Sequence, residues 1–260
     1  MTLISFKRLA GCLATVVLGT AALPDAASAA DPTPCSFKIF KKFGPRLQPN
    51  TFTLQFTFDP GTLPALQPGT NIRYDRVRFE RRLLSGANTW SYARSRCEPP
   101  LSGGVGLSVR SFESDQRAGV RDGSSVIELG SQITVNRACM AKVLACATFW
   151  VEGDPSPLPG EGTIAESDIQ FNDEVRWWTG LREVPESASG PGPGNEVYDL
   201  WSVAAHEFGH SIGFNHVSED PDAPSWVRAQ MMYYSIGSKV EKRYLMGSDY
   251  EALCTLYPCF

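Results

Sequence analysis

All three histidines of this 260-residue chain stand in one short segment, at His206, His210 and His216. The surrounding residues are compatible with a helix over 200–212, which places the first two histidines on one helical face. A straight helix would carry the third about 9 Å further along its axis. Gly213 accepts the left-handed conformation that ends helices, so the chain can turn back sharply there. We therefore expect the three imidazoles to meet at one point.

Three converging imidazoles beside a carboxylate form the donor set of a catalytic zinc site. Imidazole nitrogens bind Zn²⁺ at about 2.0–2.1 Å, and a site with three protein ligands keeps a position open for water. Glu207 follows His206 but is rotated by about 100° around the helix, so it borders the metal without ligating it. A lone histidine is more often structural, but three of three at this spacing are not a coincidence. We predict one Zn²⁺ held by His206, His210 and His216, with Glu207 as the catalytic general base.

The pattern His-Glu-x-x-His-x-x-Gly-x-x-His, from His206 to His216, resembles that of the metzincin metallopeptidases. That family carries a methionine turn beneath the metal, and the resemblance assigns this role to Met232, although ordinary core packing would place a methionine there equally well. From about Ile164 onward the chain is most similar to the matrixin branch, particularly its simple bacterial members. Three segments carry this similarity: Tyr198-Asp199-Leu200, Asp168-Ile169-Gln170-Phe171-Asn172 and Leu253-Cys254-Thr255-Leu256-Tyr257-Pro258.

Several positions depart from the matrixin pattern. Val217 follows the third histidine, where matrixins usually place serine, and Tyr234 replaces the proline common after the Met-Tyr pair. Tyr234 fits three roles: a weak fifth ligand, an oxyanion donor or a packed tyrosine. The surroundings of Cys35 do not match a cysteine-switch motif, and the chain has no further histidine for a second, structural zinc.

The resemblance implies a secreted zinc-dependent endopeptidase that acts on proteins or peptides, which would dock as an added strand on a sheet edge. Two alternatives stay open: a secreted zinc-containing binding protein without turnover, and a metzincin of another branch with narrow specificity.

Ca²⁺ is possible at the acidic stretch 219–222, for which a solvated loop is the simpler interpretation. The segment 235–246 should form part of the substrate pocket. We expect a monomer.

The N-terminus is typical of a signal peptide. Lys7 and Arg8 precede a short apolar core from Leu9 to Leu23, and Ala27-Ser28-Ala29-Ala30 provides small residues for cleavage after Ala29 or Ala30. We therefore expect export, to the extracellular space or the periplasm.

Cysteine usage is consistent with export. Without the leader, six of the seven cysteines remain: Cys35, Cys97, Cys139, Cys146, Cys254 and Cys259. An even number in an exported chain predicts up to three disulfides, with 15 possible pairings. Buried free thiols are the alternative, and no Cys-x-x-Cys spacing suggests a zinc site.

Charge and hydropathy exclude two classes of partner. The net charge is −4 and the pI about 5.5, which argues against binding to nucleic acid because no basic stripe reverses the balance. No segment reaches the roughly 18 uninterrupted apolar residues of a membrane span.

Hydrophobic periodicity predicts one α+β domain. The expected strands cover 52–58, 105–109, 126–129, 143–151 and 168–172. A long early helix within 71–93 would bury Ile72, Phe79, Leu83 and Trp90 and present its arginines to solvent. The active-site helix would begin after Asp199 as its N-cap, and a last helix would close the chain. Gly153 to Gly162 and Glu186 to Gly194 are expected surface loops.

The predicted organisation is therefore a signal peptide (1–30), an N-terminal extension (31–50) and a matrixin-like zinc peptidase domain (51–260). That domain would be a single metzincin-like catalytic domain, with a mixed twisted sheet, the long early helix, the active-site helix and the C-terminal helix.

Overall fold

The computed structural model describes residues 46–47, 53–93, 105–112, 116–130, 143–152, 163–182 and 196–257. The predicted leader, nearly all of the predicted extension and both predicted surface loops lie outside these ranges. The same holds for four of the six remaining cysteines, which are Cys35, Cys97, Cys139 and Cys259.

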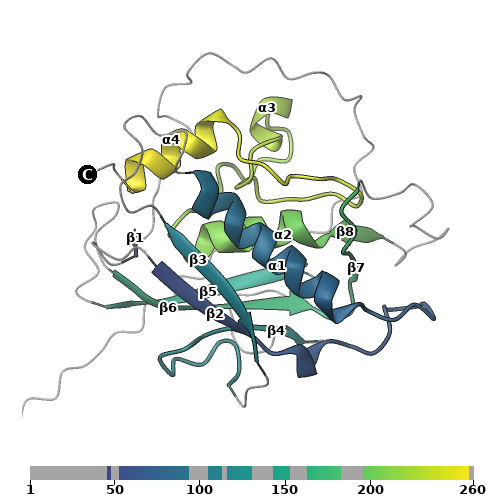
Figure 1. Cartoon of the computed structure of the whole chain (residues 1–260). Coiled ribbons are helices and arrows are strands. Elements are labelled where there is room, and N and C mark those ends of the chain that lie inside the picture. The colour runs from purple at the N-terminus through teal and green to yellow at the C-terminus, as the bar shows by residue number, and fades with distance from the viewer. Residues whose placement is uncertain are drawn as a thin grey trace, which may run out of the picture.

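The chain forms a mixed sheet with helices packed on it (Figure 1). The strands are β1 (Arg46–Leu47), β2 (Thr53–Phe58), β3 (Gly106–Ser111), β4 (Ser125–Gly130), β5 (Ala145–Glu152), β6 (Thr163–Asn172), β7 (Arg176–Trp178) and β8 (Val197–Asp199). The helices are the 3-10 turn η1 (Pro60–Thr62), α1 (Arg76–Ser91), α2 (Leu200–Ser211), α3 (Ser225–Arg228) and α4 (Gly247–Leu256).

The main sheet has the order β1-β6-β4-β2-β3, and β5 also pairs with β6. Every pairing in it is parallel except that of β5 with β6, and β7 and β8 form a separate parallel pair. The predicted α+β class is confirmed, with a mixed sheet, a long early helix, the helix that carries His206 and His210, and a C-terminal helix.

The predicted alternation in β2 determines how the sheet meets the helices. Phe56 and Phe58 are fully buried, whereas Gln55 between Leu54 and Phe56 is exposed. The Phe56 ring contacts Phe208 of α2 edge-on at 5.0 Å between centroids, and Phe58 stacks on Phe79 of α1 at 5.6 Å. Because residues two apart in a strand share a face, α1 and α2 cover the same side of the sheet (Figure 1).

The opposite face of the sheet carries buried acidic residues of β6. Asp168 accepts hydrogen bonds from the backbone N–H groups of Gly119 and Val126, at 2.6 and 2.8 Å. Glu166 accepts from those of Asp122 and Gly123, at 3.1 and 2.7 Å. The connection between β3 and β4 is therefore tied to β6 through its own backbone. Burial raises the pKa of Asp168 to about 8, despite the two N–H donors.

The sequence prediction was wrong at two residues near α1. Ile72 is 56% exposed and precedes the helix, because α1 begins only after its N-cap Asp75, whose side chain accepts from Arg78 N. Arg82, expected in solvent, is 4% exposed because its guanidinium lies over the Trp201 ring, 5.6 Å from the centroid.

Some elements were not predicted at all. β1 falls within the predicted extension and joins the edge of β6, and β7, β8 and α3 were not expected as regular structure. The strand expected at 168–172 is longer and starts at Thr163. No helix among the described residues is long and apolar enough to cross a membrane.

The raised pKa of Asp168 predicts a pH dependence of stability. In the unfolded chain this carboxyl ionises near pH 3.9, but in the folded protein it keeps its proton until about pH 8. Its contribution to the free energy of unfolding is therefore complete below about pH 4 and is lost as the pH rises to about 8. Thermal unfolding of metal-free protein at pH 5 and pH 8 should show a smaller difference for Asp168→Asn than for wild type. Equal differences would contradict this assignment.

Helices α1 and α2 approach each other closely at Gly86. A Cβ atom there would lie 2.7 Å from Ala204 Cβ and 2.8 Å from the backbone nitrogen of Ala205. Since backbone cannot move aside cheaply, Gly86→Ala should destabilise the protein by roughly 1–2 kcal/mol, although alanine favours helices more than glycine does. Leu84→Ala, at a position 40% exposed, is the control and should change stability by about 0.5 kcal/mol at most. Denaturant unfolding measures both, and a stabilised Gly86→Ala protein would contradict the close approach.

Candidate metal centre

Helix α2 begins at a buried cap. The side chain of Asp199 accepts hydrogen bonds from Ser202 N at 3.0 Å and from Ser202 Oγ at 2.6 Å, so it satisfies a free N–H of the first turn as an N-cap does. The prediction of Asp199 as N-cap is confirmed. The helix is buried at every residue except Trp201, which places His206 and His210 inside the protein.

The end of α2 turns the chain back toward the helix. Gly213 has a φ of 94° and its N–H donates to His210 O at 2.9 Å, while Phe214 N donates to Gly209 O at 3.0 Å. This pair of bonds is the Schellman motif. The positive φ expected of Gly213 is confirmed, and the turn brings the following residues back over the helix as far as His216.

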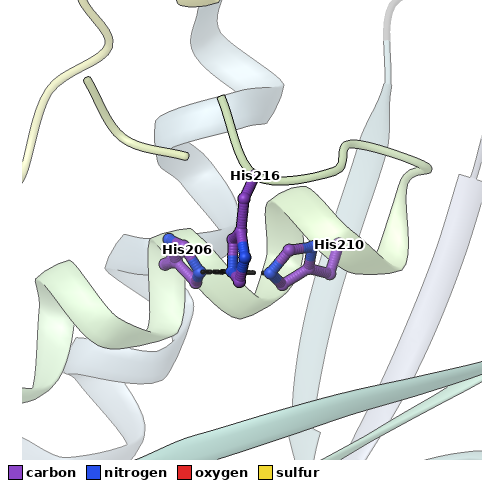
Figure 2. Close-up of side chains that lie close together, drawn as sticks. All are labelled: His206, His210 and His216. Atoms are coloured by element: carbon purple, nitrogen blue, oxygen red, sulfur yellow. Dashed lines mark hydrogen bonds between the residues drawn. The ribbon is translucent and has the colours of Figure 1, made fainter. Parts of the chain in front are cut away.

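The three histidine rings converge through their Nε2 atoms (Figure 2). His206 Nε2 lies 3.1 Å from His210 Nε2 and 3.3 Å from His216 Nε2, and one ligand atom from each ring lies within 4.8 Å of the other two. Two nitrogens bound tetrahedrally to one zinc at 2.0–2.1 Å would be about 3.3–3.4 Å apart. The donor set therefore fits a zinc ion, and it is the only group of histidine, cysteine and acidic side chains with metal-site spacing in the described part of the chain.

Each ring is oriented by an acceptor at its other nitrogen. His206 Nδ1 donates to Met231 O at 2.8 Å, His210 Nδ1 to Phe214 O at 2.6 Å, and His216 Nδ1 lies 3.4 Å from a carboxylate oxygen of Glu219. With a proton on Nδ1, each ring presents the lone pair of Nε2 to the centre. These acceptors could not be predicted from residue types, because two are backbone carbonyls, which any residue supplies.

The electrostatics keep the histidines neutral. Burial and the adjacent His216 hold the pKa of His206 well below its usual range, and burial with both other histidines does the same for His210. Burial also lowers the pKa of His216, although nearby Glu219 opposes the shift. Neutral imidazole is the form that binds a metal ion.

Glu207 is a buried acid without compensation. Its side chain is fully buried, and neither carboxylate oxygen has a hydrogen-bond partner. Burial raises the pKa of this carboxyl to about 8, opposed by the nearby backbone N–H of Ala147 in β5, which does not reach hydrogen-bond geometry with either oxygen. A buried carboxylate without a partner is costly for a fold, and such groups cluster at functional sites.

Met232 packs directly against α2. It is fully buried, and a methyl group added at Gly209 would collide with its Sδ atom and with the Trp90 ring. Trp90 in turn donates from Nε1 to Ala205 O at 2.6 Å and stacks on Phe214 at 4.9 Å. The methionine therefore lies against the helix that carries the histidines, as the resemblance implies.

Asp249 and Tyr234 lie beside the methionine turn. Asp249 of α4 accepts from Met231 N at 3.1 Å and from Met246 N at 2.8 Å, and thereby fixes the carbonyl that orients His206. Asp249 was not among the site residues predicted from the sequence. The centroid of the Tyr234 ring lies 6.3 Å from that of the His216 ring, so this tyrosine borders the site.

Comparison with known proteins agrees with this geometry. The matrixin family model matches residues 155–258. The C-terminal part of the chain is matrixin-like. It is 33% identical over 111 residues to metalloendoproteinase 1 of Glycine max, which covers 40% of this chain and 32% of that protein. It is 32% identical over 100 residues to matrix metalloproteinase-25 of Homo sapiens, which covers 38% of this chain and 15% of that protein. No solved structure matches significantly.

The predicted resemblance to matrixins is confirmed for this part. The match includes α2, the three histidines and Met232, whereas β2 to β5 and α1 precede it. The chain thus spans about a third of the plant relative and a smaller share of the human one.

The turn at Gly213 predicts a graded mutational effect. Gly213→Ala puts a Cβ atom at a φ of 94° and should cost about 1–2 kcal/mol of stability. Gly213→Asn should cost less, because asparagine tolerates this region. The turn returns His216 to the other two rings, so zinc affinity should fall more in Gly213→Ala than in Gly213→Asn. Competition with a chromophoric chelator measures it. Equal zinc affinity of both variants and wild type would contradict the role given to the turn.

Proposed function

We propose that this chain is a zinc-dependent endopeptidase in which His206, His210 and His216 hold the metal and Glu207 is the general base. The observation that carries the proposal is the convergence of three Nε2 atoms at zinc spacing beside a buried glutamate without partners. Structural zinc sites usually have four protein ligands. Three ligands and an adjacent free acid favour an open catalytic site over a binding protein that holds zinc structurally.

Zinc in this site would polarise the scissile carbonyl and lower the pKa of a bound water from 15.7 toward about 7. The protein's own groups would move the proton. Glu207 would accept it from the attacking water at a carboxylate oxygen and deliver it to the nitrogen of the leaving amine.

The sheet offers a place for the substrate. β5 is antiparallel to β6 and pairs with no other strand among the described residues, and α2 packs against it. An extended peptide could add along the edge of β5 that faces away from β6, with main-chain hydrogen bonds supplying affinity. This supports the proposed docking of peptide substrates beside the metal.

We propose further that the protein is exported. The predicted leader over 1–30 supports this, as do the cysteines, of which Cys146 in β5 is disulfide-bonded. N-terminal sequencing of protein secreted by its host tests the cleavage after Ala29 or Ala30, and an intact N-terminus would contradict it.

Replacement of the base provides the sharpest test of the mechanism. Glu207→Gln keeps the shape of the side chain but cannot accept the proton, so peptide hydrolysis should fall by about 10²–10⁴-fold or more. Zinc content, measured by atomic absorption, should stay at one ion per chain. Turnover at the wild-type rate by the zinc-loaded variant would rule out Glu207 as the base.

Metal removal separates the enzyme from the zinc-holding binding protein. Hydrolysis of a mixed peptide pool should be lost with a chelator and restored by added Zn²⁺. A protein that binds zinc and cleaves no peptide in the pool would favour the binding protein. Cleavage of only a few sequences would favour a metzincin of narrow specificity.

A further inference from the structure

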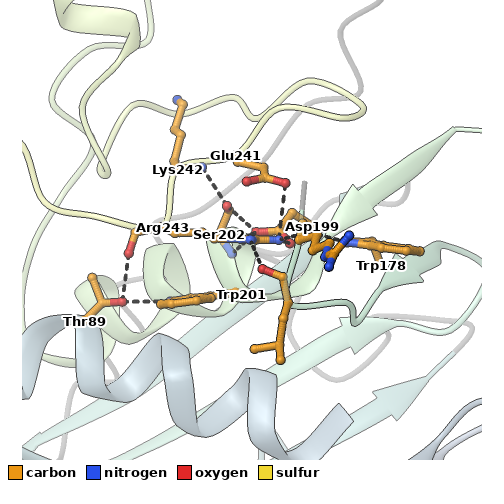
Figure 3. A network of polar contacts seen from close by, with 10 residues as sticks. Thr89, Trp178, Asp199, Trp201, Ser202, Glu241, Lys242 and Arg243 are labelled. Carbon is orange, nitrogen blue, oxygen red and sulfur yellow. Dashed lines mark hydrogen bonds and ion pairs between the residues drawn. The ribbon is translucent and has the colours of Figure 1, made fainter. Parts of the chain in front are cut away.

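A buried ion pair between Asp199 and Arg243 lies at the N-terminus of α2 (Figure 3). His210 lies at the other end of this helix. Arg243 Nε donates to Asp199 Oδ2 at 3.0 Å and Nη2 donates to Asp199 Oδ1 at 2.7 Å. The side chains are 7% and 0% exposed. This two-point contact fixes the guanidinium in one orientation relative to the helix cap.

The same guanidinium reaches two other segments. Nη1 donates to Leu181 O at 3.0 Å and Nη2 to Arg182 O at 3.3 Å, in the residues that follow β7. Its carbon atom lies 5.3 Å from the centroid of the Trp201 ring in the first turn of α2. Arg243 therefore joins the start of α2 to the segment after the methionine turn and to the residues that follow β7.

The backbone of Lys242 and Arg243 is also held in place by hydrogen bonds. Lys242 N donates to Ser202 Oγ at 2.7 Å, and that hydroxyl donates to Asp199. The carbonyl of Arg243 accepts from Thr89 Oγ1 at 3.2 Å, and Trp201 Nε1 donates to the same hydroxyl at 2.9 Å. We call this set, Asp199, Ser202, Lys242 and Arg243, the N-terminal clamp.

The cap alone does not require this charge pair. An N-cap needs only a side-chain oxygen, which serine, threonine or asparagine supplies without charge. Burying two charges carries a desolvation penalty that their attraction often does not repay. The pair therefore calls for a role other than ending the helix.

The position of the clamp indicates that role. His206 is carried by α2, but its Nδ1 acceptor, Met231 O, belongs to the segment 231–246. Asp249 binds both ends of that segment, and the clamp binds it near residue 243 to the start of α2. The clamp and Asp249 together fix the segment relative to the helix.

We propose that Arg243 is a positioning residue, which through Asp199 holds the segment 231–246 against α2 and so keeps Met231 O aligned with His206. The inference rests on the proposed zinc site and deepens it, since the same segment contains Met232 and includes residues 235–246, which are expected to form part of the substrate pocket. Loss of the two-point contact would loosen the segment without removing a ligand.

The test compares conservative variants of the pair. Arg243→Lys keeps the charge but cannot bind Asp199 at two points, and Asp199→Asn keeps the cap oxygen but removes the charge. Each should raise the zinc dissociation constant about tenfold and lower kcat about tenfold at saturating zinc, which is the lower end of effects known for residues behind metal ligands. KM should change less. Assays are run at a temperature where circular dichroism shows each variant fully folded.

Matched controls come from an exposed pair on α1. Arg76 contacts Glu80 at 2.9 Å, with side chains 52% and 29% exposed, so Arg76→Lys and Glu80→Gln repeat both substitutions away from the site. They should leave zinc affinity and kcat unchanged. Amide hydrogen exchange of metal-free protein adds a readout independent of activity: the amides of Ser202 and Lys242 should exchange faster in Arg243→Lys and at the wild-type rate in Arg76→Lys.

A double variant separates positioning from stability. Asp199→Asn with Arg243→Met removes both buried charges, so its melting temperature should recover relative to the single Asp199→Asn variant, while zinc affinity should stay low. Wild-type zinc affinity and kcat in folded Arg243→Lys would overturn the proposal, as would recovery of zinc affinity together with stability. If wild type cleaves no peptide but the zinc and exchange results hold, the proposed function fails and the positioning role stands.

Discussion

The metal site depends on which nitrogen of each of the three imidazole rings carries the proton. Each Nδ1 faces an oxygen, so each Nε2 faces the common centre. Two of these oxygens are backbone carbonyls, of Phe214 just after α2 and of Met231 much later in the chain. The ligand geometry is therefore a property of the backbone path. The Schellman turn at Gly213 and the contacts of Asp249 serve mainly to fix that path.

The part of the chain that resembles matrixins is supported by a part that does not match. Residues 155–258 contain α2 and the histidines, but α2 packs on α1 and on the sheet. Trp90 donates to the carbonyl of Ala205 one residue before His206, and Phe56 of β2 contacts Phe208. The N-terminal half thus supplies packing that the metal site needs, even though its sequence carries little family signal.

The sequence was informative where a local pattern has one structural solution. Alternation predicted β2, helical spacing predicted α1, and Asp199 and Gly213 were identified as helix ends because few residue types suit those positions. Elements whose formation depends on distant partners were not visible. β7 and β8 are short strands that exist only as a pair, and the burial of Arg82 depends on Trp201, far away in sequence. Asp249 and Arg243 resemble surface residues until the fold places their backbone and side-chain partners beside them.

The buried acids on the face of the sheet opposite α1 and α2 have a consequence for sequence variation among relatives. Glu166 and Asp168 bind the connection between β3 and β4 through its N–H groups, not through its side chains. Because the carboxylates bind backbone groups, they constrain the conformation of the connection and place little constraint on the identity of its side chains. Relatives should therefore keep acids at these two positions and glycines at 119 and 123, where φ is 82° and 86°, while the intervening loop residues drift freely.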